Sequence, residues 1–344
     1  MRGFDAIRGQ DLPVKILRHY MRSGRVPHAL LFTGIEGIGK RTTARLFAMA
    51  LNCTRSPAGG GTPETAAGDA PCGQCRVCRR IVAGKHPDVI ELAPIKGILR
   101  IEQIRHLLAG LAMKPFSAPQ RVVLIGDAQA MNAAAANALL KMLEEPPEAT
   151  TLILTAHQRA DLLPTIASRC RHLRFSPLAS ADIVVLLRSA LDISDEAAGA
   201  VAESAEGSYT RALRLAQAGW LARRDWLLRA TGLDQPPTST PRPLTWALAL
   251  SAQLAGQKDR IETDFEILKS WIRDLSVWPY LPARIIHRDR EATLAHVGAT
   301  LGAGQLLDLW EVLEKAEKNI AANGNLRLTL DVMTLRMAQV VKGR

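Results

Sequence analysis

Two groups of residues in this sequence have the types and spacing that a chemical site requires, and the first is a glycine-rich stretch. It runs from Gly34 to Thr42, after a short apolar run at 29–33 and before a helical pattern at 43–50. In a turn between a buried strand and a helix, glycines let backbone N–H groups approach a phosphate, and a lysine reaches the outer phosphates. The stretch therefore predicts a nucleotide site whose residues are Gly34, Gly37, Gly39, Lys40 and Thr42.

Two positions that would hold Mg²⁺ in such a site depart from the pattern of an ATPase. The residue after the lysine, where a Ser or Thr hydroxyl is expected, is Arg41. The apolar run at 122–125 leads into Gly126 and Asp127, where ATPases of this type carry two acidic residues, and only Asp127 is acidic. Because Mg²⁺ bridges and neutralises the outer phosphates, we expect little or no hydrolysis by the chain alone. We expect at most weak binding of ATP or ADP, without firm ligation of Mg²⁺.

The second group is a set of cysteines, Cys53, Cys72, Cys75 and Cys78. The last three form a double C-x-x-C, and 18 residues separate Cys53 from Cys72, enough for the chain to fold back. Four thiolates complete a tetrahedral shell around Zn²⁺ and leave no position for water, so the predicted zinc site is structural. The alternative is unpaired or redox-active cysteines. The intervening segment 56–70 is rich in Gly, Pro, Ala and Thr, which predicts a flexible surface loop.

An arginine, Arg169, lies between Ser168 and Cys170, after a loop at 159–165. A guanidinium is always charged, and one held on such a loop can reach across a subunit boundary and bridge γ-phosphate oxygens. On the residues alone, a surface salt bridge is the more frequent role of such an arginine. Cys170, standing apart from the other four, is predicted to be a small buried hydrophobic residue.

The elements that must position these residues alternate between strands and helices as far as Pro177. Helical periodicity covers 100–112 and 133–145, the second with Asn132 as its N-cap. Apolar runs predict strands at 29–33, 88–92, 121–125, 151–155 and 173–175. This alternation predicts the α/β fold class, a parallel sheet with helices on both faces. Ligands then bind at the carboxyl ends of the strands, where the glycine-rich stretch lies.

Beyond residue 177 the pattern is helical, and three domains are predicted. The first is an α/β domain at 1–177 that carries the metal module at about 53–80. A small helical lid follows at 178–231. After a proline-rich linker at 232–243, a helical domain occupies 244–344.

Composition narrows the class of protein further. The net charge of +11 favours nucleic acid or another polyanion as a neighbour. There is no apolar run of about 18 residues and no signal-peptide pattern at the start. We therefore expect a cytoplasmic protein without a membrane partner.

Two motifs carry a family resemblance. The segment from Asn137 to Pro147 reads NALLKMLEEPP, and the segment from Leu163 to Cys170 reads LPTIASRC. Together with the cysteine insertion and the run at 28–32, they resemble the bacterial clamp-loader branch of the AAA+ family. The motifs cover residues 9 to about 215, and the remaining helices fit a collar domain. The resemblance implies an AAA+ α/β module with a lid and an oligomerising collar, which helps to load a ring-shaped sliding clamp on primed DNA.

Two types within that branch compete. The gamma or tau type is an ATP-hydrolysing motor, whereas the delta-prime type is a stator that hydrolyses little or no ATP and contributes an arginine finger. The motor has metal ligands at the positions that Arg41 and Gly126 occupy here. The motor also has an arginine in its second sensor, and the corresponding position here is Thr210, with an arginine, Arg211, only at the next position.

Other features also resemble the stator. They are the segments 86–88 and 323–331, the atypical first-sensor region at 154–157, and the end at Arg344 without the long tail of one motor form. The resemblance therefore implies the stator type, in which Arg169 acts on the ATP of a neighbouring subunit. The motor type is the alternative. The implied partners are gamma or tau motor subunits and delta in a hetero-pentamer of DNA polymerase III, the sliding clamp, and primed DNA.

Overall fold

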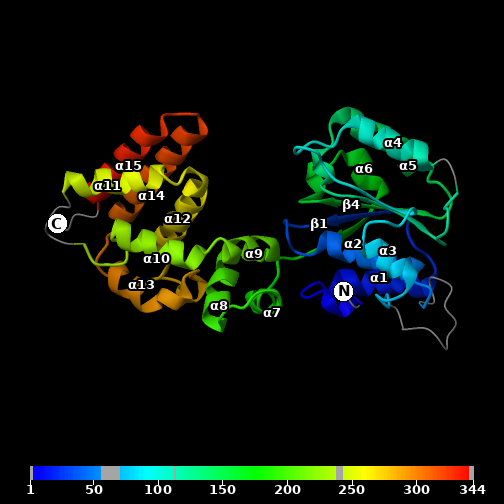
Figure 1. Ribbon diagram of the computed structural model, residues 1–344, viewed down its shortest axis with the longest axis horizontal. Coiled ribbons are helices and arrows are strands. Elements are labelled where there is room, and N and C mark those ends of the chain that lie inside the picture. Colours follow the sequence, from blue (N-terminus) through cyan, green and yellow to red (C-terminus); the bar gives the residue numbers. More distant parts are fainter. Residues whose placement is uncertain (1–2, 56–69, 112–113, 238–242, 341–344) are drawn as a thin grey trace. The chain divides into compact units, whose positions relative to one another are not determined.

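A computed structural model of the chain describes residues 3–55, 70–111, 114–237 and 243–340. The chain divides into two compact units (Figure 1). The first unit contains Met1–Ile183 and Glu206–Arg211, and the second contains Val184–Ala205 and Ala212–Arg344. The division into three domains ending at 177 and 231 stays a prediction. The loop expected at 56–70 lies outside the described residues except for Ala70, as does part of the expected linker.

The first unit is built on five parallel strands in the order β2-β3-β4-β1-β5. The strands are β1 (Ala29–Thr33), β2 (Val89–Leu92), β3 (Arg121–Ile125), β4 (Thr150–Ala156) and β5 (Arg171–Arg174). The central strands β1, β3 and β4 are buried along their whole length, which explains their unbroken apolar sequence. The predicted parallel sheet is confirmed.

Helices cover both faces of this sheet, as predicted (Figure 1). On one face lie α1 (Asp11–Ser23), α2 (Lys40–Asn52) and α3 (Arg76–Val82); on the other lie α4 (Ile101–Leu111), α5 (Ala133–Glu144) and α6 (Pro164–Arg169). Successive side chains of β1 serve the two cores in turn. Leu30 and Phe32 belong to the cluster with the first three helices, and Leu31 to the other. Two hydrophobic core layers, one on each face of the sheet, therefore hold the strand ends in place.

The second unit is helical. It continues α7 (Ser180–Ala190), which begins in the first unit, and contains the helices α8 (Asp195–Ser204), α10 (Trp220–Thr231), α11 (Leu244–Ala255), α12 (Ile261–Val277), α13 (Glu291–Gly298), α14 (Ala303–Ala321) and α15 (Leu326–Val340). The helix α9 (Tyr209–Gln217) begins in the first unit and ends in the second. Short 3₁₀ turns occur at Phe4–Ala6, Ala128–Ala130, Arg159–Asp161, Lys258–Arg260, Pro282–Arg284 and Arg288–Arg290. The part of the chain described after Pro177 contains no strand, as expected.

Two hydrogen-bonded contacts between buried polar groups link helices of the second unit. Arg223 of α10 donates to both carboxylate oxygens of Asp264 of α12, the contact from Nε being 2.7 Å long. Trp271, fully buried in α12, donates to the carbonyl oxygen of Leu233 at 2.8 Å. These bonds join α10 and the turn after it to α12. No helix in the described ranges is both long and apolar enough to cross a membrane.

A buried carboxylate fixes the start of β2 to the chain before β3. Asp88 is 1% exposed and accepts hydrogen bonds from the backbone N–H groups of Phe116, Ser117 and Ala118 at 2.6, 2.8 and 3.0 Å. Burial raises the pKa of Asp88, but these three hydrogen bonds outweigh it and hold the pKa below its usual value. The ionised form therefore stabilises this edge of the sheet.

Replacing this carboxylate by an amide, in Asp88→Asn, is expected to lower the free energy of unfolding by about 1–3 kcal/mol at neutral pH. Because the folded-state pKa of Asp88 is depressed, its contribution is present above the unfolded-state pKa and is lost as the pH falls through the folded-state value. Chemical denaturation at several pH values measures this. The two proteins should converge in strongly acidic solution. The same change at the exposed Asp192 is the control, and an equal loss there, or a loss independent of pH, would contradict the assignment.

Candidate functional site

The glycine-rich loop joins β1 to α2 at the carboxyl ends of the strands. The Gly34 N–H donates to the carbonyl oxygens of Ala156 and His157 at 3.2 and 2.9 Å, which ties the loop to the end of β4. Gly34 has φ +144°, and a Cβ atom there would lie 2.7 Å from the Phe175 carbonyl oxygen. Only glycine fits that position.

The segment at 208–210 closes over the middle of this loop. Tyr209 N–H donates to the Gly37 carbonyl oxygen at 3.1 Å. Gly37 has φ +79°, and a Cβ atom there would lie 2.4 Å from Ser208 Oγ and 2.8 Å from Thr210 N. Glycine at position 37 therefore permits the close packing that brings this distant segment to the loop.

A cavity of about 300 Å³ lies beside the loop. Of the residues predicted for the nucleotide site, those lining it are Gly37, Gly39, Lys40, Thr42 and Asp127. Gly34 does not line it but contacts Lys40, whose ammonium donates to the carbonyl oxygens of Gly34 and Ile35, the second at 2.7 Å. Lys40 is 6% exposed, and this burial lowers its pKa, while the charges of Asp127 and Glu36 act in the opposite direction. The predicted loop residues are thus brought together around one cavity.

The two positions that lost their metal ligands are neighbours in space. A Cβ atom at Gly126 would lie 3.6 Å from Nε and 3.7 Å from Cζ of Arg41. A guanidinium therefore lies where an ATPase has a hydroxyl and a carboxylate directed at Mg²⁺. Among the described residues that line the cavity, only Glu36 and Asp127 offer carboxylates. This donor set does not fit the magnesium site of an ATPase.

The cavity lining includes side chains that were not predicted as site residues, among them Thr155 and Tyr209. Thr155 Oγ accepts a hydrogen bond from Asp127 N–H at 3.0 Å, and Asp127 has the left-handed conformation, φ +50°. In the sequence, Thr155 could have been found as a polar residue at the end of an apolar strand. At the second-sensor position, Thr210 lines the cavity, whereas Arg211 does not and forms an ion pair with Glu206 at 3.5 Å.

The four clustered cysteines meet at one point. Cys53 follows α2, Cys72 lies before α3, Cys75 is the N-cap of α3, and Cys78 is in its first turn. Their Sγ atoms all lie within 4.8 Å of one another. Zn–S bonds of about 2.3 Å in a tetrahedron place sulfur atoms about 3.8 Å apart. The donor set and its spacing fit a closed metal site.

Backbone N–H groups point at these sulfur atoms. Cys75 N–H donates to Cys72 Sγ at 3.3 Å, and Cys78 N–H donates to Cys75 Sγ at 3.4 Å. Burial raises the pKa of Cys53 and of Cys78. For Cys75, hydrogen bonds from Cys78 and Thr54 overcome burial and lower the pKa to about 6. Four thiolates this close together would repel one another, so a divalent cation is the group that would hold all four ionised.

Arg169 ends α6 and forms an exposed ion pair. Its Nη2 lies 2.7 Å from Glu144 Oε1, and its Nη1 donates to the Thr165 carbonyl oxygen at 3.0 Å. The surface salt bridge that the residues alone favoured is therefore present. The neighbouring Cys170 is buried, 8% exposed, as expected for a small hydrophobic residue.

The register of the sheet places Arg169 far from its own chain's loop. β5 begins at Arg171, which pairs with Leu30 near the start of β1. The glycine-rich loop follows Thr33, at the other end of the same strand. Since the strands are parallel, Arg169 lies at their amino ends and Lys40 at their carboxyl ends. Arg169 cannot serve the cavity of its own chain.

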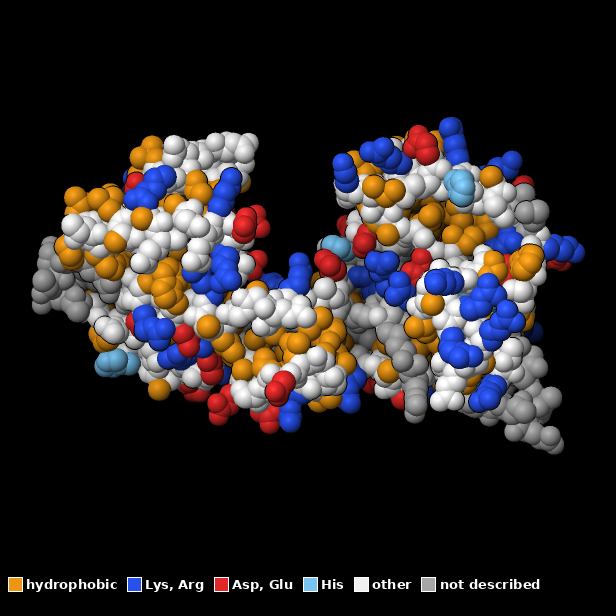
Figure 2. All heavy atoms as spheres, viewed as in Figure 1, with side chains coloured by type: hydrophobic (Ala, Val, Ile, Leu, Met, Phe, Trp, Pro, Cys, Tyr) orange, Lys and Arg blue, Asp and Glu red, His pale blue; other side chains and the backbone are white. Residues whose placement is uncertain are grey.

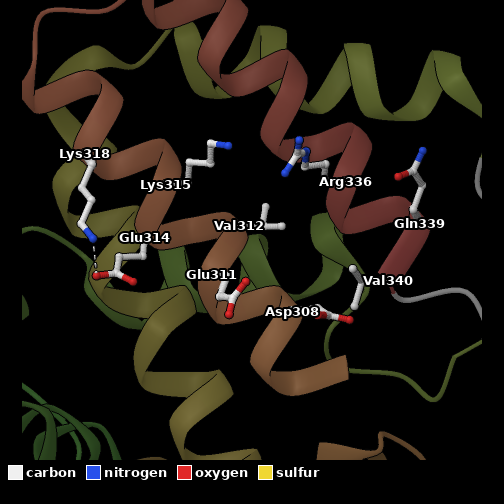
Figure 3. A pocket seen from close by; sticks show the side chains of 9 residues that line it. All are labelled: Asp308, Glu311, Val312, Glu314, Lys315, Lys318, Arg336, Gln339 and Val340. Atoms are coloured by element: carbon white, nitrogen blue, oxygen red, sulfur yellow. Dashed lines mark ion pairs between the residues drawn. The ribbon is translucent and has the colours of Figure 1, made fainter. Parts of the chain in front are cut away.

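Two further surface features are rich in charged side chains. Lys and Arg side chains gather over α1 and α3 of the first unit (Figure 2), where exposed residues include Lys15, Arg22, Arg76, Arg79 and Arg80. In the second unit, a cavity of about 610 Å³ lies between α14 and α15, with Lys315 and Arg336 pointing toward each other (Figure 3). Its lining mixes acidic and basic side chains.

Comparison with known proteins agrees with this architecture. Residues 9–179 match the model of a family described as DNA polymerase III, delta subunit. DNA polymerase III subunit delta' of Pseudomonas aeruginosa is 36% identical, over 64% of this chain and 65% of that protein. DNA polymerase III subunit tau of Bacillus subtilis is 25% identical, over 98% of this chain and 61% of that protein. The chain thus spans less than two thirds of either relative.

One solved structure, a DNA polymerase III gamma subunit-related protein from Thermotoga maritima, is 16% identical with a TM-score of 0.44, covering 95% of this chain and 98% of that one. The family assignment rests instead on the matched sequence and on the five-stranded parallel module that it covers. Over residues 9–179 the chain thus matches the DNA polymerase III delta-subunit family, and together with the 36%-identical relative this match supports a clamp-loader protein of the delta-prime type.

Proposed function

We propose that this protein is a stator of the DNA polymerase III clamp loader, which helps to load the sliding clamp on primed DNA. In this role it supplies Arg169 to the ATP site of a neighbouring motor subunit. The observation that carries the proposal is the placement of Arg169 at the amino ends of the strands, exposed and opposite its own phosphate loop. An arginine there can act only on a nucleotide that another subunit binds.

The degenerate loop supports the same role. A positive guanidinium stands beside Gly126, where an ATPase has a metal ligand. Without the metal, charge that develops on the γ-phosphate during hydrolysis is not neutralised. The chain is therefore proposed to contribute to ATP hydrolysis in trans and not at its own loop.

Other regions of the molecule are proposed to have roles in the same clamp-loader assembly. The helical second unit is proposed to act as the collar that binds gamma or tau subunits and delta in a hetero-pentamer. The charged groove between α14 and α15 is a candidate contact surface for it. The basic surface over α1 and α3 is compatible with a polyanion such as primed DNA. The four cysteines are proposed to bind a structural Zn²⁺.

A second candidate function is an autonomous ATPase, the gamma or tau type of motor. Two observations favour it: Lys40 and Asp127 both line the cavity, and the tau relative aligns with almost the whole chain. The loss of ligands at positions 41 and 126 opposes it.

ATP turnover by the isolated chain separates the two functions. With Mg²⁺ and excess ATP, the unchanged chain and Lys40→Ala are expected to release phosphate at the same background rate, because no ligand at 41 or 126 holds the metal. Phosphate release measured for both proteins, purified in parallel, is the assay. Clear turnover that Lys40→Ala abolishes would favour the motor. Turnover that survives this change would indicate a contaminating ATPase, which further purification removes.

A further inference from the structure

Basic side chains form a stripe along α1. Lys15, Arg18 and Arg22 are three and four residues apart, so they share one face of the helix. Lys15 and Arg22 are exposed, whereas Arg18 is half-buried and pairs with the exposed Asp5 at 2.8 Å. A different face of α1 is buried in the core through Val14, Leu17 and Met21. The helix therefore presents a positively charged face to solvent.

A second basic stripe lies on α3. Arg76, Arg79 and Arg80 are exposed and share one face of this helix. Cys78 and Ile81 of the same helix are buried in the core that α1 also covers. Both stripes therefore lie on one side of the sheet, where Lys and Arg side chains gather in Figure 2. Together they form the basic surface, whose exposed cations are Lys15, Arg22, Arg76, Arg79 and Arg80.

The cysteine cluster fixes the position of the second stripe. Cys75 is the N-cap of α3, and its Sγ accepts a hydrogen bond from Cys78 N–H at 3.4 Å. Cys53, which follows α2, lies in the same cluster. Side chains on a helix held in this way need less ordering when they bind than side chains on a loop. The arginines of α3 are therefore already placed for a partner.

Little negative charge is available to neutralise the basic surface. In the described ranges 11–55 and 70–87, the acidic residues are Asp11 and Glu36. Asp11 is the first residue of α1, where a helix N-terminus favours negative charge, and Glu36 lines the cavity beside the glycine-rich loop. No ion pair with a described residue is formed by Lys15, Arg76, Arg79 or Arg80. These cations can therefore meet an anion from solution.

We propose that the basic surface binds the phosphate backbone of a nucleic acid duplex without reading its sequence. A duplex carries one negative charge per about 1.7 Å of its axis, and contacts from Lys and Arg release the counterions that surround it. Interfaces with nucleic acid are rich in positive charge, whereas the centre of an interface between proteins is depleted of charged residues. The basic surface has the first of these compositions, and the net charge of +11 acts in the same direction.

The exposed side chains favour a duplex over a single strand. Proteins bind single strands largely through aromatic side chains on which successive bases stack. In the described ranges 11–55 and 70–87, the exposed large hydrophobic residues are Leu12, Ile35 and Val82, none of which is aromatic. Phosphates are therefore the groups that this surface recognises, and a duplex presents twice as many per unit length as one strand does.

The basic surface is separate from the other sites of this chain. α1 and α3 cover one face of the sheet, whereas α6, which ends at Arg169, packs against the other. The described lining of the cavity beside the glycine-rich loop includes none of the five cations. The contact goes beyond the proposed stator role, because it needs neither ATP nor a neighbouring subunit.

Binding of a labelled duplex of about 20 base pairs to the isolated full chain, followed by fluorescence anisotropy without ATP, tests the proposal. Between about 50 and 200 mM salt, the logarithm of the dissociation constant should rise with the logarithm of the salt concentration with a slope of about 4, as four or five phosphate contacts predict. A duplex of unrelated sequence should bind equally, within about twofold. A single strand of the same length should bind at least about threefold more weakly.

Matched substitutions locate the contact. The double variant Arg79→Gln with Arg80→Gln should weaken duplex binding at about 100 mM salt by at least about tenfold and lower the slope by about 2, because each phosphate contact contributes about 1. Lys15→Gln should lower the slope by about 1. The control, Arg100→Gln with Arg105→Gln, removes two exposed arginines at α4 on the other face of the sheet and should keep the slope. Thermal melting confirms that each variant is folded.

Both double variants lose the same charge, so a difference between them cannot arise from net charge. The proposal fails if the unchanged chain does not bind the duplex in about 50 mM salt, if the two double variants bind alike, or if the single strand binds as tightly as the duplex. Polyglutamate that displaces the duplex at an equal concentration of charge would also overturn it and would assign the surface to an acidic protein. Failure here would leave the trans action of Arg169 untouched, since the assay contains no ATP and no other subunit.

Discussion

The Arg169→Ala variant is expected to fold and to assemble with its sister subunits, but to lower the ATPase rate of the assembled clamp loader. A guanidinium that bridges γ-phosphate oxygens stabilises charge in the transition state, and its loss costs up to about 10³-fold in rate at the site served. The overall fall is smaller where several sites share the hydrolysis. The exposed Arg169 side chain lies at the end of α6 and pairs only on the surface, so little stability is lost with it.

Steady-state phosphate release by the reconstituted complex, with clamp and primed DNA present, measures this fall. Glu144→Ala is the matched control, because it breaks the same ion pair but leaves the guanidinium. If Arg169 acted only through that pair, both variants would have the same rate. Arg174→Ala removes an exposed arginine from the other end of β5 and should leave the rate unchanged. An unchanged rate for Arg169→Ala in a fully assembled complex would refute the action of Arg169 on the ATP of a neighbouring subunit.

The largest effect on stability is expected from the cysteine cluster. Cys78→Ser should abolish binding of one Zn²⁺ per chain and strongly destabilise the first unit, because a structural zinc site contributes about 10 kcal/mol or more of apparent binding free energy. Cys78 is buried against α2 and the sheet, so the loss of the cluster exposes part of that core. Metal content by atomic absorption and thermal melting, with and without a chelator, measure both consequences.

Cys170→Ala is the matched control for this experiment. It removes a buried thiol from the opposite core and should keep the zinc content unchanged. A chelator should lower the melting temperature of the unchanged protein and of Cys170→Ala, but not that of Cys78→Ser. A metal-free protein of undiminished stability, or a disulfide among the four cysteines under reducing conditions, would overturn the structural zinc site.

Local pattern was sufficient to predict the central strands and α5, but not α6, whose first residues fall in the loop expected at 159–165. The strands β1, β3 and β4 are buried along their length, so each appeared as an apolar run. Asn132 was predicted as the N-cap of α5, and its side chain accepts a hydrogen bond from Ala135 N–H at 2.8 Å. Periodicity and capping are properties of neighbouring residues, so the sequence displays them directly.

The contacts within the site could not be predicted from the sequence, for a physical reason. That Gly37 is required by Ser208 and Thr210, or that Glu91 is committed to Arg45, depends on segments far apart in the chain. The sequence indicated that Arg41 and Gly126 are both unusual, but not that they touch. Pairings of this kind follow from strand order and packing, which single-residue patterns do not encode.

By itself, the sequence determined the parallel α/β class, the set of four cysteines, and the loss of metal ligands at positions 41 and 126. Each of these follows from residue type and short spacing. Only the tertiary structure decided where Arg169 and Arg41 lie. The register of β5 with β1 places Arg169 at the edge opposite its own loop, and the contact between α2 and the end of β3 places Arg41 beside Gly126. Both depend on how a parallel sheet orders strands that are distant in sequence, because that order decides which side chains share an edge.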